Sequence, residues 1–187
     1  RKQIGINFQF EVLVCDSNSS DNTKSLCKSY KKNKSFNVIY LNTKINNLSF
    51  KRNLGIKFAN SNRLIFIDDD CIPENNFIKS YLKDFSLIDH KTILSGIVSY
   101  PKNYVRQNNH ITFKQSRHFN HKNIYKDKEI APDKIVAMNM GIILSKEFKN
   151  LGLFNENFDG YGFEDYEFAY RYNLNNFKLI KTKATIL

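Results

Sequence analysis

The sequence predicts an α/β fold in which a mostly parallel sheet carries helices on both of its faces. The first hundred residues alternate short apolar runs of strand character with segments whose apolar residues recur at helical spacing. Parallel strands need such helical crossovers, so this alternation favours a parallel sheet over a series of hairpins. The 187 residues are 41% hydrophobic and 14% aromatic, and we expect one domain with a substantial core.

Turn residues and caps separate the elements of the first hundred residues. Strands are expected over residues 11–16, 36–41, 63–67 and 92–100, and helices over 22–30, 49–60 and 75–88. Ser49 is expected to cap the second helix, because its hydroxyl can accept from a free backbone N–H group. The apolar faces expected on the three helices are Leu26, Cys27 and Tyr30; Leu54, Phe58 and Ala59; and Phe77, Ile78, Tyr81, Leu82 and Phe85.

The pattern changes between Pro101 and Pro132, where Asn, Lys, His and Gln are frequent and periodic apolar residues are few. A long irregular insertion of this kind inside a compact domain is usually functional or mobile. Beyond it we expect a strand within 135–144, a short helix from Ser145, a loop over 155–162, a helix over 164–175 and a last strand over 177–180.

Three consecutive aspartates, Asp68, Asp69 and Asp70, follow the apolar strand run at residues 65–67. Two carboxylates ~5 Å apart repel by roughly 3 kcal/mol at an effective dielectric near 20. A hard cation such as Mg²⁺ or Mn²⁺ would compensate this repulsion, and such ions also bind substrate phosphates. The alternative is a solvated acidic loop. Asp16 also ends an expected strand, so these carboxylates should share the ligand-binding rim of the sheet.

A second acidic stretch, FDGYGFED, covers residues 158–165. The glycines that flank Tyr161 allow a tight backbone, and Glu164 and Asp165 open the helix that follows. One interpretation is that these acids only stabilise the helix N-terminus. The other is that one of them serves as a general base on the same rim as the metal site.

Composition narrows the function classes without choosing among them. The net charge of +11 suits nucleic acid, an anionic membrane surface or an anionic substrate, although the basic residues are scattered and RNA-binding or zinc-finger signatures are absent. No apolar run approaches the ~18 residues of a membrane span. The three cysteines lack CxxC spacing, which favours a reducing compartment.

Four stretches together resemble family-2 glycosyltransferases of the GT-A fold, with the pattern of bacterial capsule and chondroitin-type polymerases. They are VLVCDSNSSDNT (12–23), SFKRNLGIKFANSNRLIFIDDD (49–70), MNMGIILSKEF (138–148) and FNENFDGYGFEDYEFAYR (154–171). They occur in the order expected for the family and cover most of the chain. The acidic Asp-x-Asp motif and the final stretch are quite specific when they occur together.

The resemblance implies a nucleotide-sugar site in the first half of the chain, residues 1–100. Asp16 would accept a hydrogen bond from the base, and Arg52 would lie near the phosphates or hold the loop beneath them. Asp68 and Asp69 would contribute to nucleotide-sugar binding. Asp70, together with Asp68, would hold Mn²⁺ or Mg²⁺, which would neutralise the departing diphosphate.

The resemblance also implies an acceptor site in the second half, residues 101–187. Asp165 would be the catalytic base, Glu164 would orient the acceptor or the sugar, and Tyr161 and Gly162 would shape the acceptor pocket. Direct in-line attack would invert the anomeric centre. Residues 102–134 are expected to contact the acceptor.

The partners implied are a nucleotide-sugar, most commonly UDP-linked, and an oligosaccharide or lipid-linked glycan acceptor, with no nucleic acid. A cytoplasmic location is expected, with peripheral association at the anionic inner leaflet. The family's first strand is missing before Arg1, and the chain stops at Leu187, where relatives place a metal-binding His. We therefore expect a fragment with weak or no activity by itself.

Two other classes compete with this interpretation. A nucleotidyltransferase would share the strand–helix–strand frame and the acidic metal site but would need a Gly-rich phosphate loop, and none is visible. A non-catalytic basic module that binds glycan or nucleic acid would make the charge of +11 the functional feature and the aspartates incidental.

Overall fold

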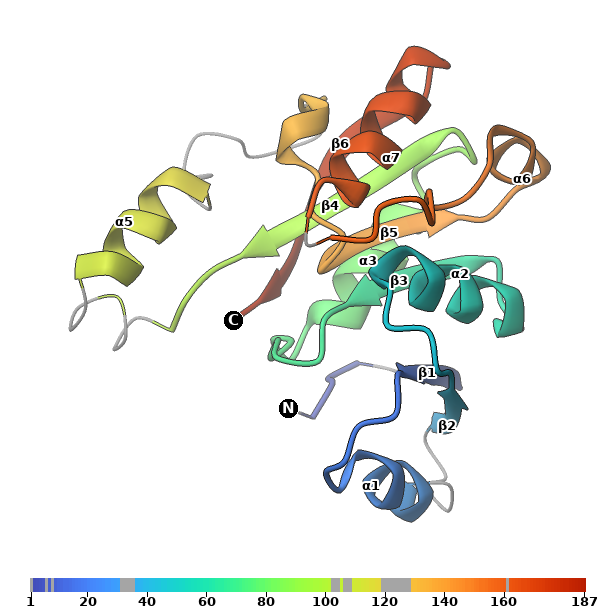
Figure 1. Ribbon diagram of the computed structural model, residues 1–187. Coiled ribbons are helices and arrows are strands. Elements are labelled where there is room, and N and C mark those ends of the chain that lie inside the picture. Colours follow the sequence, from blue (N-terminus) through green and yellow to red (C-terminus); the bar gives the residue numbers. More distant parts are fainter. Residues whose placement is uncertain are drawn as a thin grey trace.

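The structure, a computed structural model, describes residues 2–5, 7, 9–30, 36–101, 105, 109–118, 129–160 and 162–187 (Figure 1). The elements of the first half are β1 (Phe10–Asp16), α1 (Thr23–Tyr30), β2 (Phe36–Asn42), α2 (Leu48–Phe58), β3 (Arg63–Ile67), α3 (Phe77–Phe85) and β4 (Thr92–Val98). Those of the second half are α5 (Asn109–His118), the 3₁₀ turn η1 (Pro132–Lys134), β5 (Asn139–Ile143), α6 (Lys146–Leu151), α7 (Glu164–Leu174) and β6 (Lys178–Ile186).

The predicted alternation of strands and helices over the first hundred residues is confirmed, with bounds that differ by a few residues. Two elements of the second half differ more. The last strand continues to Ile186 instead of ending at residue 180, and helix α5 lies in the stretch that showed no clear periodicity. Figure 1 shows α5 standing apart from the sheet, beyond the end of the long strand β4.

The α/β fold class is confirmed, but the strand pairing is more mixed than expected. β1 pairs with β2 in parallel, and the other four strands form a sheet in the order β3-β5-β4-β6. β4 and β6 are parallel, whereas β5 runs antiparallel to both β3 and β4. The difference arises because β5, from the second half of the chain, inserts between two strands of the first half.

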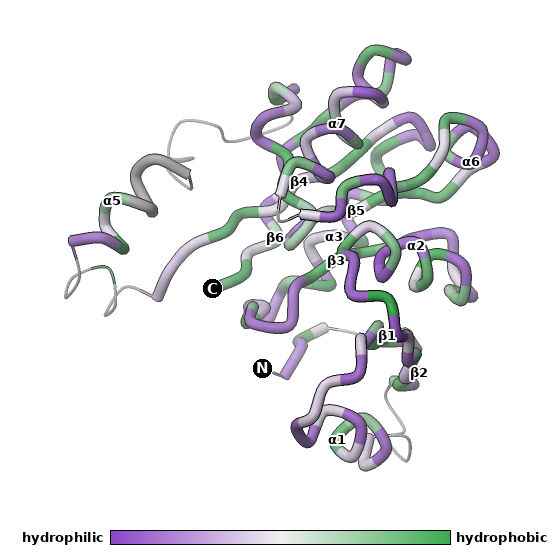
Figure 2. Tube along the Cα trace, in the orientation of Figure 1, coloured by the Kyte–Doolittle hydropathy of each residue, from purple (hydrophilic) through white to green (hydrophobic). Residues whose placement is uncertain are grey.

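Helices cover both faces of the larger sheet, as the sequence predicted. On one face, Phe77, Tyr81 and Phe85 of α3 pack with Leu94 and other buried residues. On the other face, residues of α6 and α7 pack against a separate cluster that includes Ile93. Neighbouring strand residues thus point into opposite clusters, as the pleat of a strand requires. Figure 2 shows that apolar residues follow the strands of this sheet, while hydrophilic ones dominate the turns around α1.

A buried asparagine ties the larger sheet together at an irregularity. Asn139 on β5 is fully buried, and its Nδ2 donates to the carbonyls of Ile97 at 2.9 Å and Ala184 at 3.1 Å. Its Oδ1 accepts from the Tyr81 hydroxyl at 2.7 Å. The β4–β6 register shifts beside Ile97, so Asn139 supplies hydrogen bonds where the ladder is interrupted. Gly96 leaves the space, since a Cβ there would lie 2.2 Å from this side chain.

Asn47, not Ser49, caps helix α2, so the predicted cap is wrong. The Asn47 side chain accepts from the backbone N–H of Phe50 and donates to the carbonyls of Glu156 and Phe158. The Asn47 amide can therefore cap the helix through its oxygen and hold two carbonyls of a distant loop through its NH₂ group, whereas a serine hydroxyl has only one hydrogen to donate. Ser49 lies in the first turn, fully buried, and its hydroxyl has no partner within the described part of the chain.

The apolar faces expected on the helices are only partly buried. The expected stripe of α3 is buried or half-buried throughout, and Phe77, Tyr81 and Phe85 carry it. On α1, only Cys27 is buried, whereas Leu26 and Tyr30 are exposed. On α2, Ile56 is buried and Phe58 is exposed. No helix among the described residues has the length and apolar character that crossing a membrane would require.

Candidate active site

The acidic triplet follows β3, as predicted, in a turn closed by a hydrogen bond from the Cys71 N–H to the Asp68 carbonyl at 3.2 Å. Asp68 is half-buried, while Asp69 and Asp70 are exposed. Burial raises the pKa of Asp68, and the charges of Asp70 and Asp69 raise it further, whereas Arg52 lowers it. The charges of Asp69 and Asp70 therefore contribute to destabilising the ionised form of Asp68.

Glu164 begins helix α7 and is 4% exposed. Its Oε1 accepts from Nη1 of Arg52 at 2.6 Å. Its Oε2 is buried and has no hydrogen-bond partner among the residues that the structure describes. Such a buried acceptor is costly unless a further donor completes it, so this edge of the site can take a donor.

Asp165 is half-buried beside Glu164. Its Oδ2 accepts from the N–H of Ala137 at 3.3 Å, and its Oδ1 accepts from the N–H of Tyr166 at 2.8 Å. Burial raises the pKa of Asp165, and the charge of Glu164 raises it further, while the two N–H groups and Arg52 act in the opposite direction. A carboxylate with a raised pKa is a stronger base than an ordinary aspartate.

Arg52 on α2 joins the two acidic stretches. Its Nη1 contacts Glu164 at 2.6 Å, and its Nη2 lies 3.7 Å from Oδ1 of Asp68. The guanidinium carbon lies 5.3 Å from the ring centroid of Phe154, and the side chain is only 12% exposed. Residues 68 and 164, almost a hundred positions apart in sequence, are therefore parts of one ion-pair network.

Asp16 ends β1 in a different environment. It is 7% exposed, and its carboxylate accepts from the N–H and hydroxyl of Ser19 and from the Tyr40 hydroxyl at 2.5 Å. These hydrogen bonds lower the pKa of Asp16, and those from Ser19 have the largest effect. The hydrogen bond between Tyr40 and Asp16 in turn raises the pKa of Tyr40 to about 12. Asn18 in this turn has a φ of 60°, a left-handed conformation that asparagine tolerates better than most residues.

Sequence reasoning missed Tyr40 as part of this site. Its backbone lies opposite Val14 in the parallel β1–β2 pair, and Asn42 lies opposite Asp16. The sequence contained a signal for this contact, because Tyr40 lies two residues before Asn42 and residues two apart on a strand share a face. The predicted contact between Asp16 and a nucleotide base stays a prediction, with the acceptor atoms already engaged by Ser19 and Tyr40.

The predicted site residues thus fall into two groups. Arg52, Asp68 and Glu164 are in direct contact, with Asp165 adjacent, whereas Asp16 is bonded within the β1–β2 unit. Tyr161 lies outside the described residues, as do 102–104, 106–108 and 119–128 of the expected acceptor-contacting stretch. Gly162 has a φ of 91°, so its backbone favours glycine, although a Cβ there would meet no described atom within 4 Å.

The donor set fits a hard divalent cation that is completed by a ligand. Among the described residues, no three His, Cys, Asp or Glu side chains gather as a ready metal site. Mg²⁺ and Mn²⁺ are commonly held by one or two carboxylates, with water and phosphate oxygens supplying the rest. Asp68 and Asp70 are two carboxylates of the kind such an ion would need, and the charges of Asp70 and Asp69 add to the burial that raises the pKa of Asp68.

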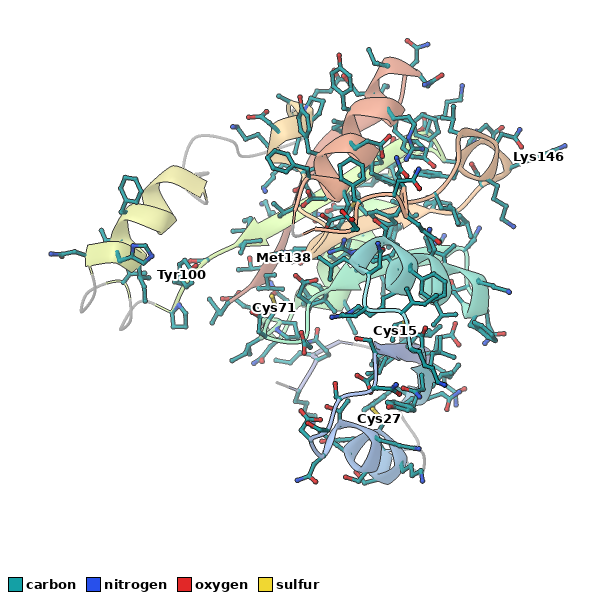
Figure 3. The ribbon with its side chains drawn as sticks, in the orientation of Figure 1. Cys15, Cys27, Cys71, Tyr100, Met138 and Lys146 are labelled. Atoms are coloured by element: carbon teal, nitrogen blue, oxygen red, sulfur yellow. The ribbon has the colours of Figure 1, made fainter. Side chains whose placement is uncertain are left out.

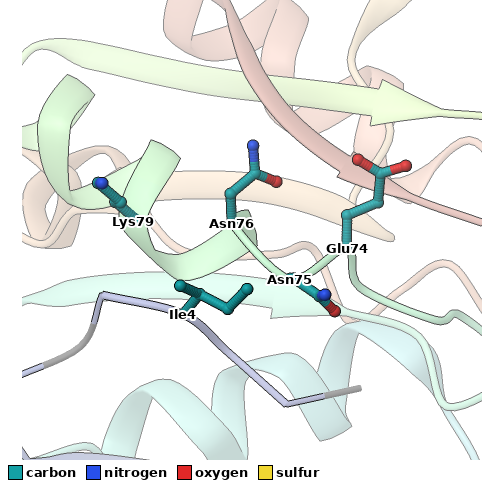
Figure 4. Close-up of a pocket in the computed structure, with 5 residues that line it drawn as sticks. All are labelled: Ile4, Glu74, Asn75, Asn76 and Lys79. Carbon is teal, nitrogen blue, oxygen red and sulfur yellow. The ribbon is translucent and has the colours of Figure 1, made fainter.

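A shallow pocket of about 390 Å³ lies away from these residues (Figure 4). Ile4 of the N-terminal segment and Glu74, Asn75, Asn76 and Lys79 line it. The Ile4 N–H donates to the Asn75 carbonyl at 2.8 Å, so the pocket is the seam where the N-terminal segment meets the start of α3. The three cysteines are free thiols, and Figure 3 shows Cys15 and Cys27 in the β1–α1–β2 part, with Cys71 separate from them.

The chain is similar to known proteins in sequence and in fold. The family model described as glycosyl transferase family 2 matches residues 2–143. Chondroitin synthase from Pasteurella multocida (strain Pm70) is 26% identical over 195 residues, which cover 88% of this chain and 20% of that protein. The chain thus spans about a fifth of that relative's length.

Two solved structures share the fold at low sequence identity. S. aureus TarS 1-349 in complex with UDP matches 98% of this chain and 53% of its own, with a TM-score of 0.65 and 17% identity. GalNAc-T7 with UDP, GalNAc and Mn²⁺ matches 94% of this chain and 37% of its own, with a TM-score of 0.62 and 14% identity. From the matched residues and the shared architecture, the chain belongs to glycosyl transferase family 2 and has a GT-A fold.

Proposed function

We propose that this chain transfers a sugar from a UDP-linked donor to a hydroxyl group of a glycan acceptor, with inversion at the anomeric carbon. The observation that supports this most strongly is the position of Arg52, which contacts both Asp68 and Glu164. The donor motif and the acid-bearing start of α7 are therefore close enough to act on one substrate. TarS has been solved with UDP and with UDP-GlcNAc, which favours a UDP-linked donor here.

On the donor side, Asp70 and Asp68 would hold Mn²⁺ or Mg²⁺, and Asp69 would take part in nucleotide-sugar binding. The bound ion would supply charge neutralisation to the departing diphosphate. Asp16 would accept a hydrogen bond from the base, once Ser19 or Tyr40 gives up one of its contacts. Arg52 keeps Asp68 and the start of α7 in place beneath the donor.

On the acceptor side, Asp165 would remove the proton from the acceptor hydroxyl as that oxygen attacks the anomeric carbon. The new C–O bond forms while the bond from that carbon to the diphosphate breaks, and the UDP leaves with the electron pair. The raised pKa of Asp165 suits it to this proton transfer. Glu164, held by Arg52, would orient the acceptor or sugar through its unpartnered Oε2.

The acceptor class is suggested by the relatives and the charge. One relative is a chondroitin synthase, so an oligosaccharide or lipid-linked glycan is the acceptor that we propose. The net charge of +11 would suit a glycan acceptor that is anionic. It would also suit peripheral association with an anionic membrane surface from the cytoplasmic side. Residues 102–134 would contact the acceptor.

A donor screen tests this proposal. The full chain would be incubated with an oligosaccharide acceptor and with UDP-GlcNAc, UDP-GalNAc, UDP-galactose or UDP-glucuronic acid, with Mn²⁺ or with EDTA, and the free UDP measured. Since the chain by itself is expected to be weakly active, we expect slow release of UDP with at least one donor, and loss of that release in EDTA. Release of pyrophosphate instead of UDP would indicate a nucleotidyltransferase, and no metal-dependent turnover of any donor would contradict the proposal.

A further inference from the structure

Three aromatic side chains lie on one outward side of helix α7. Phe163, Tyr166 and Tyr170 are 73%, 41% and 48% exposed. The last two are four residues apart, and their rings stack with centroids 5.9 Å apart and an angle of 25° between the planes. Residues four positions apart share a helix face, and Phe163 is the residue just before the first turn of α7, so we define these three exposed side chains as the aromatic stripe.

The backbone at Phe163 is unusual in a way that burial does not explain. Its φ is 71°, in the left-handed region that glycine occupies freely and bulky residues rarely adopt. A large residue in this conformation is usually held by a well-packed side chain, but the Phe163 ring is mostly in solvent. Strained residues of this kind cluster where a side chain serves a ligand. The conformation presents an exposed ring at the start of α7, where glycine would be easier to accommodate.

The stripe starts next to the acidic residues of the candidate active site. Phe163 immediately precedes Glu164 and Asp165, so the first ring belongs to the residue before the start of α7, where the proposed base lies. The opposite side of α7 is occupied by the core, where Phe168 and Tyr172 are fully buried. An occupant of the stripe would therefore lie along the exposed side of the helix, beginning near its acidic start.

The chemistry of the stripe favours a glycan over an anionic group or a phosphate. Arg171 and Glu167, the charged residues near it on α7, pair with each other at 2.6 Å, which leaves the rings without a free cation of this helix beside them. Tyrosine combines a flat apolar face with a hydroxyl that donates and accepts hydrogen bonds. Pyranose rings present the complementary surface, with apolar C–H faces and hydroxyl groups around the edge.

We propose that Phe163, Tyr166 and Tyr170 form a stacking platform for the acceptor glycan, beyond the sugar unit that reacts. This inference rests on the proposed function, because it takes the reacting end to be at Asp165. Seven residues of helix separate the first ring from the last, which is roughly 10 Å along the axis. The platform therefore underlies more than one sugar unit and makes binding depend on acceptor length.

The test uses the full chain and two separate binding measurements. UDP with Mn²⁺ reports on the donor site, and chondroitin, hyaluronan and N-acetylglucosamine oligosaccharides of increasing length, displayed on a glycan array, report on the platform. We expect at least one of these glycans to bind more tightly as it lengthens. The double variant Tyr166→Ala/Tyr170→Ala should weaken that binding about tenfold and abolish the length dependence. Phe58→Ala, which removes an exposed ring from α2, is the matched control and should bind as the wild type does.

Two further variants separate stacking from a structural role. Phe163→Gly removes a ring and the backbone strain together, so it should melt at the same temperature as the wild type or higher while binding the glycan more weakly. Tyr166→Phe keeps the flat ring and should retain most of the binding, whereas Tyr166→Leu keeps only the apolar character and should lose it.

Several outcomes would overturn the platform without touching the proposed function. One is a wild type that binds UDP but no glycan on the array. Another is a double variant that binds glycan as tightly as the wild type, and a third is a Tyr166→Leu variant that does so. If Tyr166→Ala/Tyr170→Ala differs from the wild type in oligomeric state but binds glycan equally well, the stripe is a contact with a second copy of the chain and not a glycan platform. Absence of UDP binding by the wild type would instead contradict the proposed function itself.

Discussion

Asp16 and Asp165 are aspartates in two regions of the molecule whose pKa values are shifted in opposite directions. Asp16, in the β1–α1–β2 unit, accepts from Ser19 and Tyr40, and these hydrogen bonds lower its pKa. Asp165, at the start of α7, has a raised pKa because burial and the charge of Glu164 outweigh its contacts with N–H groups. One carboxylate is thus held ionised as an acceptor, while the other stays basic enough to take a proton.

The two regions also differ in packing. Among the described residues of the β1–α1–β2 unit, the buried ones are Asp16, Cys27 and Val38, so a charged group is a large part of this interior. In the larger sheet, β4 is buried along nearly its whole length, and aromatic rings of α3, α6 and α7 fill both faces. We infer that the larger sheet provides most of the stability, while the smaller unit depends on polar contacts.

The largest effect is expected from Asp165→Asn, which removes the proposed base and keeps an oxygen that can accept from the Ala137 N–H. Transfer to the acceptor should fall by ~10²- to 10⁴-fold, because a positioned general base contributes that much to rate. Steady-state rates of UDP release in the presence of acceptor measure it, with circular dichroism as the control for folding. A loss of less than tenfold would show that another group takes the proton.

The difference in packing is tested by removing one apolar side chain from each region. Phe168 is fully buried and stacks on Phe154 with centroids 4.3 Å apart, so Phe168→Ala should cost about 4 kcal/mol of unfolding free energy. Val12 on β1 is 38% exposed, and Val12→Ala should cost about 1 kcal/mol or less. Urea unfolding measures both, and equal losses would contradict the inferred difference between the regions.

Lys181 on β6 gives the larger sheet a pH dependence of its own. The side chain is 7% exposed, its Nζ donates to the Gly96 carbonyl at 2.6 Å, and burial lowers its pKa from 10.5 to about 8. Between these two pH values the unfolded chain binds more protons than the folded one, so stability rises with pH across the window. The shift corresponds to about 3 kcal/mol.

Lys181→Met should remove this contribution. The unfolding free energy of the wild type should rise relative to that of the variant between pH 8 and 10.5, as measured by urea unfolding at a series of pH values. The loss of the hydrogen bond to Gly96 adds a constant offset and does not change the slope. Parallel pH profiles for the two proteins would mean that Lys181 titrates normally.

The smallest shift in a pH profile is expected from Glu164→Gln, which should reduce the difference in pKa between the two aspartates. The charge of Glu164 raises the pKa of Asp165, so its removal should lower that pKa. The acidic limb of the pH–rate profile, where Asp165 becomes protonated, should then move to lower pH. A limb that stays in place, or moves to higher pH, would mean that another group controls the rate in that range.

Local patterns were sufficient to predict the order of strands and helices in the first hundred residues and the position of both acidic motifs. The apolar run of β3 followed by three aspartates, and the acidic start of α7, depend on neighbouring residues and appear where expected. Arg52 was identified from the resemblance as part of the donor site, and the structure gives it partners in both motifs.

The features that the sequence did not predict depend on contacts between distant residues. Asn47 is preferred to Ser49 as a cap because it also holds the carbonyls of Glu156 and Phe158. Strand β5 enters the sheet through pairings with β3 and β4 that no local pattern records. The Tyr40 contact with Asp16 and the Asn139 network likewise join residues from separate strands.

The most direct test of the central claim, that Asp70 and Asp68 bind a metal-bound UDP group beside Asp165, is calorimetric titration of the chain with UDP. We predict binding that requires Mn²⁺ and is weakened at least about tenfold in Asp70→Asn, which corresponds to 1.4 kcal/mol or more. Asp133→Asn, which removes the same charge from the exposed turn η1, should bind UDP as the wild type does. UDP binding that is equal with and without Mn²⁺, or unchanged in Asp70→Asn, would contradict the account.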